Sequence, residues 1–309
     1  MNATAAPPGP LDALNRVLSS VDSVRNGRAL YALLATFAAA GLLLAVAENA
    51  LARDAMRWGM AWGGAALTTL FYGSNAAGLI LFDEALGLPC RDVGQALRDA
   101  LASAHRLLLV LVSVLALALL LLALLAAALW VTRVPLFGAA LFGLLLPAAV
   151  VIVGVAALSG VAVVAPLAAP AIWGGHGVAS TLRLLARHVR ARLLFAALLM
   201  SAVSGLAALV GAIVTFVVMT GGRVVSALAV VAAGIELPPQ LLMAGLFGHG
   251  LRSLGAAGAP AVQSSYAQAA LAGGGVVFML ALVLPALVYL RGTCSVYVAL
   301  EERSAATAS

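Results

Sequence analysis

The sequence predicts an all-α fold: a polytopic membrane helix bundle of about six transmembrane helices, with amphipathic helices at the cytoplasmic interface. Its longest uncharged run covers the 49 residues 134–182, which contain no Asp, Glu, Lys or Arg. A helix of a soluble protein needs a polar face, whereas about 20 apolar residues cross the roughly 30 Å hydrocarbon core of a bilayer. Composition points the same way, because 64% of the chain is hydrophobic and 9% is charged, against about 25% charged residues in soluble proteins.

Six apolar segments are long enough to cross a membrane. Their lengths run from 18 to 28 residues, which fits a bilayer when tilt is allowed to vary. The third is the most apolar, and Ser113 is its single hydroxyl-bearing residue. The predicted spans are 30–47, 60–82, 107–131, 146–168, 193–220 and 267–290.

The distribution of arginine predicts the orientation, because all 17 basic residues are Arg. With six spans, one side of the membrane carries 12 of them and the other carries 5, and the positive-inside bias places the richer side in the cytoplasm. Both termini are therefore expected in the cytoplasm. This divides the chain into an N-terminal tail with an amphipathic helix (1–28), a six-span membrane domain (29–291) and a C-terminal tail (292–309).

The composition also suggests a cellular location. Ala, Leu, Gly and Val dominate and Lys is missing, a bias typical of a GC-rich genome, so we expect a multi-pass protein of a bacterial inner membrane. The first apolar run is longer than the core of a secretory signal peptide, and no basic segment directly precedes a cleavage motif. We expect this run to stay in the membrane as the first span.

Two apolar stretches, 134–145 and 224–235, do not fit the count of six spans. Each has 12 residues, which is too short to cross the hydrocarbon alone. Each fits a re-entrant segment, a surface-lying segment or part of an extra span. An extra span near 224 would place Arg223 inside the membrane at high cost, so six spans are retained.

Three cytoplasmic segments have apolar residues at helical spacing and are predicted to be interfacial helices that turn into the next span. In the third of these helices, arginines lie about a quarter-turn from the apolar stripe. The predicted stripes are Leu11, Leu14, Leu18 and Val21; Val93, Leu97, Ala100 and Ala104; and Val178, Leu182, Leu185 and Val189. The second and third segments align with an offset of 85 residues, from Val93 to Val178. Either the chain is a two-fold repeat, of the kind that flanks the substrate site in transporters, or similar composition makes the two segments look alike.

Two sets of residues are candidates for binding. Arg183, Arg187, Arg190 and Arg192 fit a contact with anionic lipid head groups, and they equally fit charge that only sets the topology. Asn75 is a polar side chain within the second span, so it fits either a hydrogen bond to a neighbouring helix or a substrate contact. Asp83 and Glu84 end the second span, where acidic residues are expected to be structural.

The residues predict no catalytic, cofactor-binding or metal site. The four histidines lack the spacing of metal ligands, and no Gly-x-Ser-x-Gly nucleophile motif is present. Cys90 and Cys294 are both expected on the cytoplasmic side, where thiols stay reduced, so no disulfide is predicted. Nucleic acid is not an expected partner, because the basic residues are spread over several short loops.

The chain resembles a group of bacterial six-helix inner-membrane proteins of unassigned activity, and the membrane domain that precedes some glycerophosphodiester phosphodiesterases. The resemblance covers about residues 60–300. It is carried by Leu81-Phe82-Asp83-Glu84-Ala85 before an amphipathic helix, and by Ala165-Pro166 with Ala169-Pro170-Ala171-Ile172-Trp173-Gly174-Gly175 before Val178 and Leu182. It implies a six-helix membrane fold and leaves the activity open, because the chain has no room for the phosphodiesterase domain.

These observations predict a non-enzymatic scaffold or accessory subunit of a membrane assembly. Its expected partners are membrane lipids, including anionic head groups, and other membrane proteins or further copies of the chain. The alternative is a transporter or lipid-handling protein, favoured by the repeat, by Asn75 and by Pro147, Pro166 and Pro170 around the fourth span. A membrane-embedded enzyme is the third hypothesis.

Overall fold

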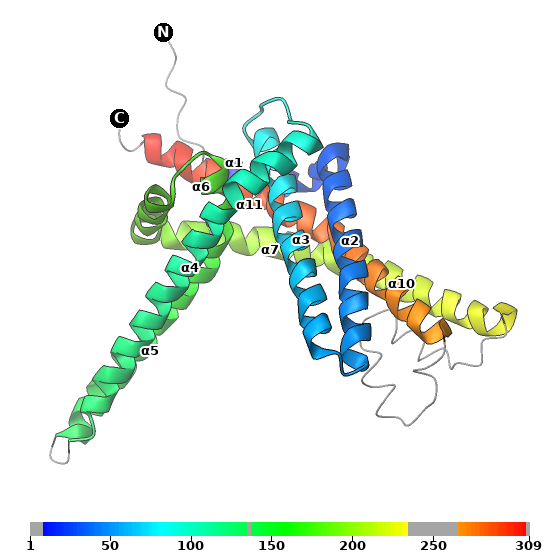
Figure 1. Cartoon of the computed structure of the whole chain (residues 1–309). Helices are drawn as coiled ribbons and strands as arrows, with labels where there is room; N and C mark the ends of the chain where they lie inside the picture. The colour runs from blue at the N-terminus through cyan, green and yellow to red at the C-terminus, as the bar shows by residue number, and fades with distance from the viewer. Residues whose placement is uncertain (1–8, 135–136, 234–264, 307–309) are drawn as a thin grey trace, which may run out of the picture. The chain divides into compact units, whose positions relative to one another are not determined.

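The computed structural model describes residues 9–134, 137–233 and 265–306, and in these ranges the chain is helical, with no strand (Figure 1). The all-α prediction is confirmed. The helices are α1 (Pro10–Leu18), the 3₁₀ helix η1 (Ser19–Arg25), α2 (Gly27–Ala52), α3 (Met56–Ala85), α4 (Val93–Val131), α5 (Gly138–Ser159), the π-helix η2 (Gly160–Val164), α6 (Ala165–Trp173), α7 (Val178–Ala233), α10 (Ser265–Ala281) and α11 (Val283–Ala306).

Among the described residues, six helices are long and apolar enough to cross a membrane. The protein is therefore a multi-pass membrane protein. The first five of these helices contain the first five predicted spans, and the sixth overlaps the predicted span 267–290. They cover Gly27–Leu51, Met56–Ala85, Val93–Val131, Gly138–Trp173, Val178–Ala229 and Ala272–Ala305.

The chain forms two compact units, each built from segments that are distant in sequence. Unit 1 comprises Met1–Leu18, Leu101–Val203 and Gly292–Ser309. Unit 2 comprises Ser19–Ala100 and Ser204–Arg291.

Unit 2 is organised around the antiparallel pair α2 and α3, with α10 against α2 (Figure 1). Small residues allow these helices to approach closely. A Cβ atom on Gly41 would lie 2.9 Å from the carbonyl oxygen of Gly275 on α10. A Cβ atom on Gly73 would overlap the side chain of Thr36 on α2. Glycine at these positions sets the distance between the helix axes.

In unit 1, η2 packs against α5 and α6, and the C-terminal half of α11 contacts the first part of α7. Its buried side chains include Val163, Leu167, Leu199 and Leu300. A Cβ atom on Gly292 would lie 2.6 Å from Cγ1 of Val203, so α11 and α7 are also in close contact. The predicted C-terminal tail is thus a packed helix as far as Ala306 and not a free segment.

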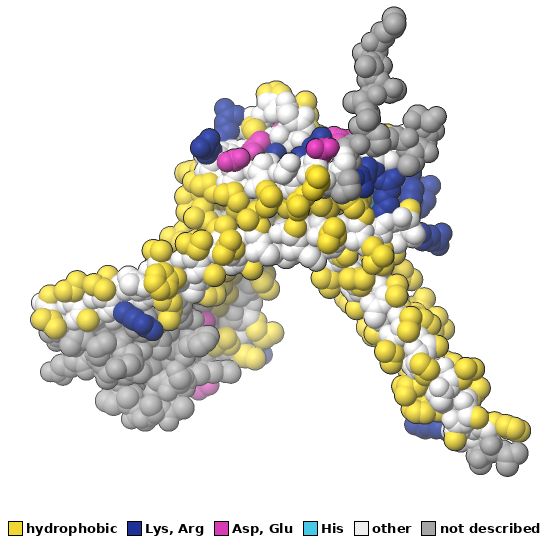
Figure 2. Space-filling view, turned by 180° about the vertical axis from the view of Figure 1, so that it is seen from behind, with side chains coloured by type: hydrophobic (Ala, Val, Ile, Leu, Met, Phe, Trp, Pro, Cys, Tyr) yellow, Lys and Arg dark blue, Asp and Glu magenta, His cyan; other side chains and the backbone are white. Residues whose placement is uncertain are grey.

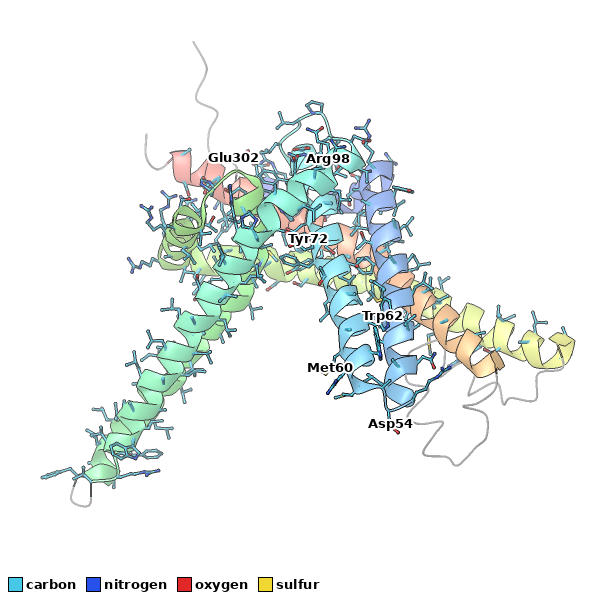
Figure 3. The ribbon with its side chains drawn as sticks, viewed as in Figure 1. Asp54, Met60, Trp62, Tyr72, Arg98 and Glu302 are labelled. Atoms are coloured by element: carbon cyan, nitrogen blue, oxygen red, sulfur yellow. The ribbon has the colours of Figure 1, made fainter. Side chains whose placement is uncertain are left out.

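The α4–α5 hairpin has little cover within unit 1. None of the 18 residues in the most apolar window of the helix 138–173 is buried, and Figure 2 shows hydrophobic side chains over the visible face of this hairpin. Trp130, near the end of α4, is exposed. In unit 2, Trp58 lies in the first turn of α3, which begins at Met56, and Trp62 lies one turn later (Figure 3); both are exposed. Tryptophan is enriched at membrane–water interfaces, so the α2–α3 and α4–α5 turns both have the composition of a membrane boundary.

The two short apolar stretches extend neighbouring helices. Residues 138–145 form the first turns of α5, and residues 224–233 continue α7; residues 135–136 and 234–235 lie outside the described residues. Pro166 lies in the first turn of α6, two residues after the end of the π-helix η2. Proline cannot donate the backbone hydrogen bond and its ring crowds the preceding turn, which a wider π turn accommodates.

The second and third predicted interfacial helices differ in how they meet the span that follows. α4 continues from Val93 to Val131 as one helix, so the second amphipathic segment does not turn into its span. α7 does change direction, at Arg192, whose φ and ψ of −146° and 24° are non-helical (Figure 1). The third segment thus ends where the sequence predicts.

The buried faces of these helices also differ from the predicted stripes. Leu11 and Leu18 on α1 are exposed, whereas Ala13 and Val17 are buried. On α7 the buried positions of the first segment include Thr181 and His188, with Leu185 shared between prediction and structure. The stripe predicted for α1 is thus exposed, as an apolar stripe turned toward lipid would be. On α7 the side that is buried in protein differs from the predicted stripe and shares only Leu185 with it.

Candidate functional site

The candidate site of unit 1 is a group of three helix segments that we call the platform: α1, residues 178–191 of α7 and residues 292–306 of α11. Adjacent residues of α11 hold the other two segments. Glu302 accepts hydrogen bonds from Nη1 of Arg16 on α1, at 2.8 and 2.9 Å. Glu301 faces His188 on α7, with Oε1 3.3 Å from Nε2. Successive residues of a helix point in directions about 100° apart. Glu301 and Glu302 can therefore contact two different neighbouring helices.

The bend in α7 is attached to the end of α11 as well. Nη2 of Arg192 donates to the backbone carbonyl of Arg303 at 2.8 Å. The Arg303 guanidinium lies 4.0 Å from the centroid of the Phe195 ring, which is cation–π distance. These contacts lie on both sides of the kink, and they fix the direction of the first segment of α7 relative to α11.

His188 is unusual for its burial, with a relative exposure of 1%. Its Nε2 and Oε1 of Glu301 are at ion-pair distance, yet neither atom has hydrogen-bond geometry with a described group. Oγ1 of Thr181, seven residues earlier on the same face, also has no hydrogen-bond partner among the described residues. Buried polar atoms are costly without partners. We therefore expect the stability of this face of α7 to depend on the neighbouring Glu301 carboxylate.

The structure separates the four predicted lipid-contact arginines into two kinds. Arg183, Arg187 and Arg190 are exposed on α7; Arg183 also donates to the carbonyl of Ala179 in its own helix. Arg192 is half-buried and donates to Arg303. Arg192 therefore holds the kink, and the other three form an outward arginine face.

A second polar cluster lies in unit 2 at the end of α3, and Arg91 is its centre. Nε and Nη2 of Arg91 each donate to the Asp83 carboxylate at 2.7 Å, and Nη1 donates to Asp99 on α4 at 2.9 Å. The hydrogen bonds and charge of Asp83 and Asp99 raise the pKa of the Arg91 guanidinium. Asp83 is buried, so this bidentate pair ties the α3–α4 connection to the helices on either side.

Glu84 extends this cluster to the beginning of α2. It accepts from Nδ2 of Asn26 at 2.5 Å and from Nε of Arg291 at 3.2 Å. The carbonyl oxygen of the Asn26 side chain caps α2 through the amide of Ala29. The expectation that acidic residues at the end of the second span are structural agrees with these contacts.

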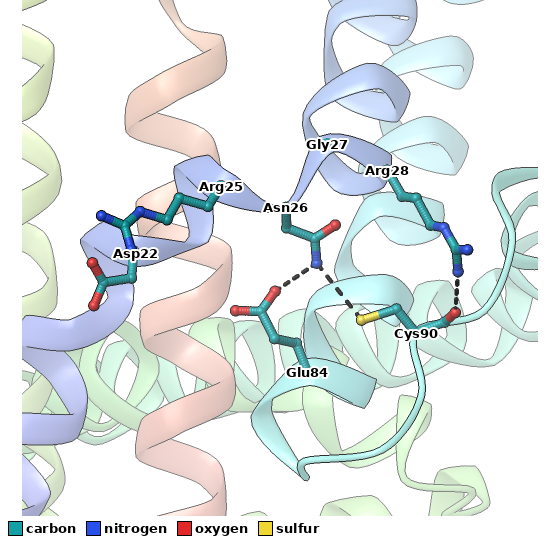
Figure 4. A pocket seen from close by; sticks show the side chains of 7 residues that line it. All are labelled: Asp22, Arg25, Asn26, Gly27, Arg28, Glu84 and Cys90. Atoms are coloured by element: carbon teal, nitrogen blue, oxygen red, sulfur yellow. Dashed lines mark hydrogen bonds between the residues drawn. The ribbon is translucent and has the colours of Figure 1, made fainter.

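An open pocket of about 620 Å³ adjoins Glu84 (Figure 4). In it Arg28 donates to the carbonyl of Cys90. Two arginines and two acids share the lining, so the pocket has no net charge with which to select an ion. Its lining residues are Asp22, Arg25, Asn26, Gly27, Arg28, Glu84 and Cys90.

Asn75, the predicted intramembrane polar contact, is buried in α3. Its Nδ2 donates to the backbone carbonyl of Phe71 one turn earlier, at 2.8 Å. The side chain thus satisfies part of its hydrogen-bonding capacity within its own helix. This geometry is that of a structural polar residue and adds no support for a substrate contact.

The two segments that align in sequence also share the geometry of the preceding helix end. In α3, Gly87 has φ +68° and the amide of Leu88 donates to the carbonyl of Asp83. In α6, Gly175 has φ +87° and the amide of His176 donates to the carbonyl of Ala171. Both are Schellman caps, 88 residues apart, and a helix follows each. Such caps end roughly a third to a half of helices, and their offset of 88 residues differs from the 85 of the sequence alignment, so the repeat stays a hypothesis.

No protein-family model, curated protein or solved structure matches the chain. Within residues 9–134, 137–233 and 265–306, no three His, Cys, Asp or Glu side chains are grouped so as to hold a metal ion.

Sequence reasoning missed the His188–Glu301 contact and the central role of Arg91. Their partners are 113 and 8 residues away, and neither separation belongs to a helical or motif pattern. The arginine face of Arg183, Arg187 and Arg190 could be found from sequence, because the three residues recur at helical spacing within one helix.

Proposed function

We propose that this protein is a non-enzymatic scaffold or accessory subunit of a bacterial inner-membrane assembly, with both termini in the cytoplasm. The observation that carries the proposal is the α4–α5 hairpin. Within unit 1 its apolar side chains, such as Leu117, Leu144 and Val150, are exposed on two consecutive membrane-length helices. Helices in membranes associate through packing against one another, so this hairpin is suited to receive helices of another chain.

The composition of α5 adds support. Gly143 and Gly154 have open space around the position of a Cβ atom, and small residues at a helix surface let a partner backbone approach closely. The polar clusters around Arg91 and around Glu301 are engaged in holding the chain's own helices. These contacts support a structural role for both groups.

Photocrosslinking in native membranes tests this proposal. A photoreactive amino acid at Leu144 or Val150 should yield a crosslink to a second protein chain. The same probe at Leu167, which is fully buried in α6, is the matched control and should crosslink only within the chain. Crosslinks from Leu144 and Val150 that reach only lipid, or only other parts of the same molecule, would contradict the scaffold.

The second candidate function is transport or lipid handling. It rests on the paired Schellman caps at Gly87 and Gly175 and on the proline-interrupted helix 138–173, features typical of repeated transporter folds. Purified protein in vesicles with a fluorescent phospholipid distinguishes the two candidates. A lipid-handling protein should move the probe between leaflets faster than empty vesicles do, whereas a scaffold should not. We also propose membership of the bacterial six-helix group that the sequence resembles.

A further inference from the structure

The arginine face of α7 points away from the body of unit 1. Arg183, Arg187 and Arg190 follow one another at intervals of four and three residues, which places them on one side of a helix. Thr181, Leu185 and His188 occupy the opposite side and are buried. Protein therefore covers the side of this segment that could have entered the acyl chains, and the three charged side chains face outward.

Charge is unevenly shared between the two units. Unit 1 has 8 arginines and 3 acidic residues, a net +5, whereas unit 2 has 9 arginines and 8 acidic residues, a net +1; together these give the +6 of the chain. Two of the acids in unit 1 already contact other helices: Glu302 contacts Arg16, and Glu301 contacts His188. Arg187 also interacts electrostatically with Glu301. The surplus of positive charge in unit 1 is complementary to an anionic partner.

The position of the arginine face indicates which kind of anionic partner it meets. Arg190 lies three residues before Leu193, where the fifth predicted span begins, and Arg183 ten residues before it. At 1.5 Å per residue these are about 5 and 15 Å along the helix, and the kink at Arg192 turns the segment away from the direction of the span. Arginine side chains at such positions reach the head-group layer.

The exposed leucines of α1 favour a lipid surface over an acidic protein as the partner of unit 1. Leu11, Leu14 and Leu18 are 75%, 36% and 51% exposed, although Arg16 attaches this helix to Glu302 of α11. A helix with exposed leucines on one side is typical of a segment lying in the membrane interface. The platform thus combines an arginine face with an apolar helix, the combination that an anionic bilayer surface accommodates.

We propose that the platform binds anionic phospholipid head groups through Arg183, Arg187 and Arg190, while Leu11, Leu14 and Leu18 of α1 enter the boundary of the acyl chains. Arg192 takes no part, because it holds the kink. This lipid-binding surface goes beyond the scaffold function and does not depend on it.

Lipid titration of the purified full-length protein, read by native mass spectrometry, tests the proposal. The wild-type chain should retain phosphatidylglycerol in preference to phosphatidylcholine. Each arginine near an anionic surface strengthens binding by about fivefold at low salt, so R183Q/R187Q/R190Q should weaken phosphatidylglycerol binding at least about tenfold and leave phosphatidylcholine nearly unchanged. L11S/L14S/L18S should weaken the binding of both lipids.

Two controls make the result specific. R53Q/R57Q/R133Q removes the same charge from the opposite predicted side of the membrane and should change binding by less than about twofold. R183K/R187K/R190K keeps the positive charge and should keep the preference for phosphatidylglycerol. If this variant loses the preference as well, the loss in the glutamine variant reflects misfolding and not the missing charge. Equal retention of the two lipids by the wild-type chain, or an unchanged preference in the glutamine variant, would overturn the proposal. Wild-type binding of an acidic peptide without a lipid preference would also overturn it, in favour of a protein-docking face.

Discussion

His188 on α7 and Glu301 on α11 lie 113 positions apart in the chain, and their side chains meet with Nε2 3.3 Å from Oε1. The histidine is almost fully buried and the glutamate is about one-third exposed. Because Glu302 binds Arg16 and Arg303 accepts from Arg192, three consecutive residues of α11 hold α1 and both sides of the kink in α7. The end of α11 is thus the organising element of unit 1.

Replacing His188 with Ala should destabilise unit 1 by about 2 kcal/mol, because it removes a buried side chain and leaves a cavity beside Glu301. Glu301→Gln should cost less than about 1 kcal/mol, since that side chain is partly in water. Cys294, which is fully buried in unit 1, is a built-in reporter in a Cys90→Ser background. Its reaction with a thiol dye on heating should begin at a lower temperature in the alanine variant than in the glutamine variant; the opposite order would refute this account of the pair.

Arg91→Ala should destabilise unit 2 by about 2 kcal/mol or more, because it leaves the buried Asp83 carboxylate without its charged partner. Arg91→Lys should recover only part of this loss, since an ammonium group cannot reproduce the two parallel hydrogen bonds. A double-mutant cycle with Asp83→Ala, followed by unfolding in a denaturing detergent, measures the coupling. Additive effects of the two alanine substitutions would show that the pair contributes nothing to stability.

Gly41→Ala should separate α2 from α10. Its Cβ atom would lie 2.9 Å from backbone atoms of Gly275 and Val276, and backbone cannot move aside as a flexible side chain can, so we expect a cost of about 1–3 kcal/mol. Gly63→Ala is the control, because its Cβ position has open space and alanine favours a helix. Thermal unfolding in detergent compares the two variants, and equal midpoints would contradict the close crossing.

Cysteine labelling at the two ends of α3 should decide the orientation. In a chain without Cys90 and Cys294, Asp54→Cys in the α2–α3 turn should react with a membrane-impermeant reagent in intact cells. Leu88→Cys in the α3–α4 connection should react only after the membrane is opened. Both positions are exposed, so differences in burial do not confound the comparison. The reverse pattern would place the arginine-rich side outside the cytoplasm.

The sequence by itself determined the fold class and the approximate spans. Hydrocarbon thickness imposes a minimum apolar length on each crossing helix, and that requirement is local, so 60–82 and 107–131 can be recognised without knowing what they contact. The end of the third interfacial segment near Arg190 was also predictable, because the run of charged residues ends where the span begins. The arginine face of α7 followed from helical spacing alone.

Only the tertiary structure decided which face of each helix is buried and which polar groups meet. In a chain where most residues are apolar, hydrophobicity does not single out one face, and small residues such as Ala13 and Gly41 make the contacts while Leu11 and Leu18 stay exposed. The partners of His188 and Arg192 are supplied by α11, more than 100 residues later. Such pairings depend on how distant helices pack, and no local pattern of residues encodes them.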